Sequence, residues 1–194
     1  MYKITKKLSG NMSSRSAPIK DKDGNRIATE AEQASRWVEH FRSVLNQPAP
    51  ANPANPPRAD TELDINTDPP TIDEIESAFK SLKNGKAAGV DGVHAEFLKA
   101  DIKTSAKALH HFFDNIWHSH SMPKDWTQGL IVKLPKKGDL QMCDNWRGIT
   151  LLSIPSKVFC KIILKRIEAA VDATLREEQS GFRRGRGCID QIFT

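Results

Sequence analysis

The sequence predicts an α+β fold in which several helices flank one small antiparallel hairpin. Apolar residues recur at the 3.6-residue period of a helix in several separate stretches. Two short runs of β-forming residues, 129–134 and 148–152, flank a turn-forming Lys-Lys-Gly-Asp segment at 136–139. No segment of the 194-residue chain repeats, so a repeat architecture is excluded.

The N-terminal region is predicted to hold one helix and little else. Residues 1–28 are polar and are expected to be mostly disordered, with a turn near Gly24. Thr29 and Glu32 then have the spacing of a capping box, which begins a helix. The apolar face of this helix consists of Ala34, Trp37, Val38, Phe41, Val44 and Leu45. We assign residues 1–46 to an N-terminal extension.

A proline-rich stretch separates this extension from the main domain. Residues 47–70 contain few large apolar side chains, which favours an extended linker. Thr71 and Glu74 then repeat the capping-box spacing, and their helix is predicted to end at Asn84-Gly85. Residues 71–194 are assigned to one partial domain.

In the sequence of this domain, helices are predicted both before and after the hairpin. A glycine-rich loop at 85–92 is followed by helical periodicity over 94–100 and 102–118. After the hairpin, Ser153 is expected to cap a long helix that has Pro155 in its first turn. The predicted buried stripe of that helix is Val158, Ile162, Ile163, Ile167 and Val171. A glycine-arginine loop and a short helix from Cys188 are expected to follow it.

Charge is distributed unevenly along the chain, whose net charge is +5. Residues 1–121 contain 16 basic and 16 acidic residues, whereas 122–194 contain 13 and 8. A basic part favours a polyanionic partner, although a surface that is basic only for solubility is an alternative. The cysteines form no C-x-x-C pair, and the chain has no signal peptide or membrane-length apolar run. We therefore expect a soluble intracellular protein with no membrane partner.

Two cations of the hairpin could bind a triphosphate. Lys136 lies in the turn and Arg147 lies near the start of the returning strand. A lysine supplies a point charge and an arginine a planar fork, and together they suit a phosphate chain. The alternative is that these residues protect an exposed hairpin from aggregation.

Two glycine-containing loops are further candidates. The segment 179–186 contains Gly181 and three arginines, Arg183, Arg184 and Arg186, which suit nucleic-acid phosphates. A solvated basic loop is the alternative. The segment 84–92 differs from a phosphate-binding P-loop, because its lysine follows the first glycine and a helix precedes it.

These three segments, in this order, resemble the fingers region of reverse transcriptases encoded by non-LTR (LINE-type) retrotransposons, most closely the RTE and jockey groups. The resemblance covers roughly residues 70–194, and residues 29–46 loosely resemble the segment before the polymerase domain. It implies part of a right-hand polymerase fold and RNA-templated DNA synthesis that uses Mg²⁺. It also implies an RNA template, a DNA primer and a deoxynucleoside triphosphate as partners.

The resemblance assigns roles to individual residues. Lys136 and Arg147 match the positions that contact the incoming triphosphate. Nucleic-acid contacts are implied for Lys86, Gly89, Lys137, Gly181, Arg183, Arg184 and Arg186. The chain departs from the family pattern at Cys188, where serine or threonine is common, and this weakens any hydroxyl–phosphate contact there.

Catalysis by residues 1–194 alone is not expected. Nucleotidyl transfer uses two metal ions held by converging carboxylates, and the palm motifs that supply them in this family are not found in the sequence. We therefore predict no catalytic residue, no metal ligand and no cofactor of its own, and weak nucleic-acid binding. The histidines at 110, 111, 118 and 120 lack ligand spacing.

Three other functions remain open from the sequence. The chain could be a nucleic-acid-binding module without catalysis or a protein–protein adaptor built on the helices at 71–118. It could also be the decayed remnant of a retrotransposon, without a role. Its oligomeric state is not predicted. A partial domain is also expected to expose apolar surface, above all on the helix at 156–171, and to have low stability.

Overall fold

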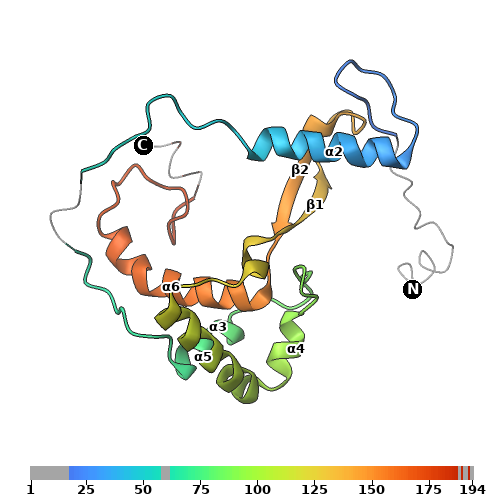
Figure 1. The fold of residues 1–194 in the computed structure, drawn as a ribbon. Helices are drawn as coiled ribbons and strands as arrows, with labels where there is room; N and C mark the ends of the chain where they lie inside the picture. The colour runs from blue at the N-terminus through green and yellow to red at the C-terminus, as the bar shows by residue number, and fades with distance from the viewer. Residues whose placement is uncertain (1–17, 58–61, 188, 190–191, 193–194) are drawn as a thin grey trace. The chain divides into compact units, whose positions relative to one another are not determined.

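The computed structural model describes residues 18–57, 62–187, 189 and 192, and it confirms the α+β class (Figure 1). The chain divides into two compact units. The first contains the described residues up to Asn55 together with Ile131–Ile149, and the second contains those from Pro56 to Leu130 and from Thr150 onward. No helix in the described part of the chain is long and apolar enough to cross a bilayer.

The first unit is built from helix α2 and most of a two-stranded hairpin (Figure 1). Helix α2, Glu30–Leu45, begins as predicted, because the Thr29 side chain accepts the backbone N–H of Glu32. The strands are β1, Leu130–Pro135, and β2, Trp146–Leu151. Between them a 3₁₀ turn, η2, covers Cys143–Asn145. Strand β2 starts earlier than the predicted 148.

The expectation of a mostly disordered N-terminal region is wrong for residues 18–28. Lys20 and Arg26 form an antiparallel β-bridge, and the Asp21 carboxylate caps the turn between them by accepting two backbone N–H groups. Ile19 is almost fully buried, and the Lys20 N–H donates to the Gln141 carbonyl. This anchoring is a long-range contact, which the local polar composition did not indicate.

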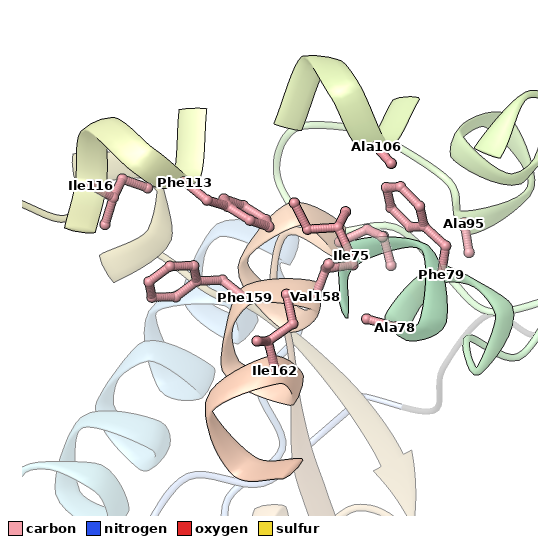
Figure 2. Packing of buried hydrophobic residues seen from close by; sticks show 11 residues of the cluster. Ile75, Ala78, Phe79, Ala95, Ala106, Phe113, Ile116, Val158, Phe159 and Ile162 are labelled. Atoms are coloured by element: carbon pink, nitrogen blue, oxygen red, sulfur yellow. The ribbon is translucent and has the colours of Figure 1, made fainter. Parts of the chain in front are cut away.

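The second unit contains the main core (Figure 2). Its helices are α3 Ile72–Lys80, α4 Ala95–Ala100, α5 Ile102–Ser119 and α6 Ile154–Asp172, with a short 3₁₀ helix, η1, at Lys124–Thr127. Helix α3 packs against both α5 and α6. The buried cluster consists of Ile75, Ala78, Phe79, Ala95, Ala106, Phe113, Ile116, Ile154, Val158, Phe159 and Ile162. The capping box of Thr71 and Glu74 is present in both directions.

Helix α3 ends earlier than predicted, at Lys80 rather than at Asn84-Gly85. The Ser81 hydroxyl donates to the Ala78 carbonyl and so competes with continued helix. The Lys99 ammonium donates a hydrogen bond to the Leu82 carbonyl at 3.1 Å. Gly85 still adopts the left-handed conformation, with φ +69°, but in the loop beyond the helix.

The last residues of the predicted linker are held on α6. The Arg166 guanidinium donates to the backbone carbonyls of Asn66, Asp68 and Pro69 and to both carboxylate oxygens of Glu74. Its side chain is only 7% exposed. This clasp joins the approach to α3 with α6. The predicted short helix from Cys188 falls mostly on residues outside those described.

Candidate nucleic-acid interface

The register of the hairpin brings Lys136 and Arg147 close together across the two strands. The Lys136 N–H donates to the Asn145 carbonyl at 2.8 Å, which sets Lys136 opposite Asn145. Lys136 therefore lies across the hairpin from a residue two positions before Arg147. Both residues, together with Lys137, are exposed.

Helix α2 covers the opposite face of the hairpin. A Cβ added to Gly148 would lie 2.6 Å from the Phe41 ring, so only glycine permits this approach. The Trp37 and Trp146 rings meet edge to face at 5.6 Å, and the Lys133 ammonium lies 4.4 Å from the centre of the Trp37 ring. Arg147, the neighbour of Gly148 in β2, therefore projects from the face that α2 does not cover.

The turn that carries Lys136 is braced by hydrogen bonds. The Lys136 ammonium donates to the Asp144 carbonyl at 2.9 Å, and the Asn145 amide donates to the Asp139 carbonyl at 2.8 Å. Lys20 forms an ion pair with the Asp139 carboxylate at 3.0 Å. The backbone N–H of Gln141, followed by Lys20, lowers the pKa of Asp139. The charge of the Asp139 carboxylate is therefore balanced by Lys20.

Behind the turn, His40 is buried against the aromatic cluster of α2. Its Nδ1 lies 3.5 Å from the Asp144 carboxylate, and its ring meets those of Trp37 and Phe41. Burial lowers the pKa of His40 despite Asp144. Burial thus disfavours the charged form of this imidazole, and the exposed cations of the hairpin are Lys136, Lys137 and Arg147.

The glycine-arginine loop does not present its three arginines equally. Arg183 donates to the Asp172 carboxylate at 2.8 and 3.3 Å and to the Arg176 carbonyl at 3.0 Å, and its side chain is 8% exposed. Arg186 forms an ion pair with Glu177. Arg184 is exposed and has no ion pair with the residues that the structure describes. It is therefore the arginine of this loop that can approach a phosphate without breaking an existing pair.

Sequence reasoning did not select Phe182, which lies between Gly181 and Arg183. Its side chain is fully exposed, and its φ of +61° is in the left-handed region. An aromatic residue between glycine and arginine in a basic loop was the signal that could have identified it.

In the loop at 85–92, the structure explains why position 89 is a glycine. A Cβ on Gly89 would lie 2.6 Å from the backbone of Leu152 and Ser153, so this glycine lets the loop pack onto the start of α6. Lys86 is exposed. The Gly85 N–H donates to the Glu96 carboxylate, and this bond is the main cause that lowers the pKa of Glu96. The loop is thus fixed at Gly85 by Glu96 and at Gly89 by close packing on Leu152 and Ser153.

Within 18–57, 62–187, 189 and 192, no three His, Cys, Asp or Glu side chains converge in a way that could hold an ion. The pair His118 and Asp114, with Nδ1 and Oδ1 3.4 Å apart, links successive turns of α5.

Comparison with known proteins found three relevant relatives, although no protein-family model matches the chain. The chain is 30% identical, over 64% of its length, to the uncharacterized 149 kDa protein of transposon TX1 from Xenopus laevis. It is 32% identical, over 60%, to the Pol polyprotein of the type-1 retrotransposable element R2 from Popillia japonica. It is 23% identical, over 99%, to the RNA-directed DNA polymerase from mobile element jockey of Drosophila funebris. It spans only 10%, 15% and 22% of these proteins.

Proposed function

We propose that this chain, a relative of the non-LTR retrotransposon reverse transcriptases, supplies nucleic-acid and triphosphate contacts of an RNA-directed DNA polymerase. The observation that supports this most strongly is the pair Lys136 and Arg147. They lie close together in a braced hairpin, and Arg147 projects from the face that α2 does not cover. The name of the jockey relative gives the polymerase activity of that protein.

The proposed triphosphate contact follows from the chemistry of the two cations. Arg147 offers a planar fork of donors that can bind two phosphate oxygens at once, and Lys136 adds a compact charge at the turn. Among the residues that the structure describes, the Lys136 ammonium bonds to the neutral Asp144 carbonyl and to no carboxylate, so binding a phosphate breaks no ion pair there. The fixed turn keeps the entropy cost of binding low.

Mg²⁺ supplies charge neutralisation and nucleophile activation when a polymerase of this class has it bound. The described residues gather no cluster that fits the ion. The proposed contribution of this chain is therefore limited to binding and positioning of template and triphosphate.

Nucleic-acid contact is proposed for three exposed cations, Lys86, Lys137 and Arg184. Each can reach a phosphate without giving up a carboxylate. Phosphate contacts of this kind position a strand but carry no sequence information. Gly181 and Gly89 shape the loops that carry these cations, while Arg183 and Arg186 order the glycine-arginine loop through Asp172 and Glu177.

This proposal is tested by the binding of a short, labelled single-stranded RNA, followed by fluorescence anisotropy between ~50 and ~200 mM salt. We expect weak binding that falls steeply with salt, and each of Lys137→Ala and Arg184→Ala lowers the slope of log affinity against log salt by about 0.7. The matched control is Lys107→Ala, because Lys107 is an exposed lysine on α5. Absence of RNA binding at the lowest salt contradicts the proposal and favours a protein–protein adaptor.

A further inference from the structure

Phe182 combines two costly features. Its side chain is fully exposed, so its apolar surface gains nothing from burial. Its φ of +61° is a conformation that bulky residues rarely adopt. Such strain persists only where the surrounding structure imposes it, and it is frequent at binding sites.

The neighbours of Phe182 impose this conformation. Arg183 is fixed by the Asp172 carboxylate and by the carbonyls of Arg176 and Gln179. On the other side, the Gln179 amide donates to the Gly181 carbonyl at 3.1 Å. The ring is therefore presented by an anchored loop.

A hollow of about 350 Å³ lies beside the ring. Its apolar lining comes from the second half of α6 and the residues that follow it: Leu164, Ile167, Val171 and Leu175. Phe182 and Arg184 line it from the loop. This volume is in the range of small-molecule sites and accommodates a planar ring.

The charges around the hollow favour an anionic partner. The Asp172 carboxylate in its lining is neutralised by Arg183. Arg184 and Lys165 add positive charge, and Glu168 is the remaining acid of the lining, three residues from Lys165 on α6. An exposed aromatic ring beside such cations suits single-stranded nucleic acid, in which bases stack and phosphates bind arginine.

We propose that Phe182 stacks on one unpaired base of a single-stranded nucleic acid, while Arg184 contacts the adjoining phosphate. The base enters the hollow against the apolar side of α6. This inference rests on the proposed nucleic-acid function and adds a residue that recognises a base. Because every base has a π-face, the contact is tolerant of sequence.

The test compares wild type, Phe182→Ala and Phe182→Trp for binding of a short single-stranded RNA and of the same strand lacking its bases. Phe182→Ala is expected to weaken RNA binding by about 5- to 100-fold, since stacking contributes ~1–3 kcal/mol per base. Its salt slope should stay at the wild-type value, Phe182→Trp should restore affinity, and wild type and Phe182→Ala should bind the abasic strand equally. The matched control is Phe97→Ala, because Phe97 is an exposed phenylalanine on α4.

The outcomes separate the two proposals. If RNA binding depends on Arg184 but Phe182→Ala binds as wild type does, the stacking inference is overturned and the nucleic-acid function stands. If wild type does not bind RNA at low salt, the proposed function fails first. If Phe182→Ala instead abolishes self-association in sedimentation velocity without changing RNA affinity, the ring contacts a second copy and the inference is overturned. An unchanged thermal melt of Phe182→Ala shows that the variant is folded.

Discussion

Residues of the same type have different roles in this protein. Arg183 and Arg184 are adjacent in the sequence, yet Arg183 is enclosed by Asp172 and backbone carbonyls whereas Arg184 is exposed. Both arginines were predicted to contact phosphates. The sequence shows that each is positively charged, but it does not show which carboxylate an arginine already pairs with. Arg183 therefore orders the loop, whereas Arg184 is the arginine for which we propose a phosphate contact.

The close packing of Gly89 on the backbone of Leu152 and Ser153 can be tested by substitution. Gly89→Ala places a Cβ 2.6 Å from the backbone of Leu152 and Ser153, where only a shift of the loop relieves the clash. We expect a loss of about 1–3 kcal/mol in the free energy of unfolding, measured by urea denaturation. Gly181→Ala is the control, because its Cβ meets nothing closer than 3.6 Å. Equal stability of the two variants contradicts the packing role of Gly89.

At the element scale, local signals predicted where several helices begin. Thr29 caps α2 through the Glu32 N–H, and the capping box of Thr71 and Glu74 is complete. Helix α6 follows Ser153 as expected, although the Ser153 side chain makes no cap hydrogen bond. What the sequence could not indicate is the partner of each element. The contact of Trp37 on α2 with Trp146 on β2 joins residues more than a hundred positions apart. No periodicity within either segment indicates that contact.

The clasp of Arg166 and Glu74 explains how the approach to α3 is fixed. Arg166 donates to Glu74 at 2.7 and 2.6 Å, and these bonds are the main cause that lowers the pKa of Glu74 to about 2. The carboxylate is only 26% exposed, so the surrounding water screens this pair less than a surface pair. The aromatic ring of Trp117 lies 5.6 Å from the guanidinium.

This clasp predicts acid sensitivity with a defined sign. Because the folded pKa of Glu74, about 2, is below the ordinary 4.5, its contribution is fully present above pH ~4.5 and is lost as pH falls toward 2. We expect at most about 3 kcal/mol to be lost across this window. Urea denaturation of wild type and Glu74→Gln at several pH values measures it. Glu76→Gln is the control and should retain the wild-type pH dependence, whereas a wild-type dependence in Glu74→Gln contradicts the assignment.

At the scale of the whole molecule, two units come from segments that interleave in the sequence. Helix α2, from the segment assigned to the N-terminal extension, and Ile131–Ile149 belong to one unit. Apolar side chains remain exposed, among them Leu164 on α6 and Leu45 on α2. The fold class and most elements followed from periodicity and capping. The grouping into units did not, since it depends on long-range packing.

The whole chain is expected to bind without polymerising. Two-metal nucleotidyl transfer needs converging carboxylates, and the palm motifs that supply them in the resembled family are not found in this sequence. Purified residues 1–194 should therefore extend no RNA-templated DNA primer in the presence of Mg²⁺ and all four deoxynucleotides. An active reverse transcriptase serves as the positive control, and extension by the purified chain would contradict this prediction.

The central claim is that Lys136 and Arg147 form one triphosphate contact. The most direct measurement is the affinity of a fluorescent deoxynucleoside triphosphate for wild type, Lys136→Ala, Arg147→Ala and the control Lys107→Ala. We predict that each hairpin substitution weakens binding by about 10- to 100-fold, as expected for loss of a charged hydrogen bond, while Lys107→Ala binds as wild type does. Equal affinity of all four proteins would contradict the claim.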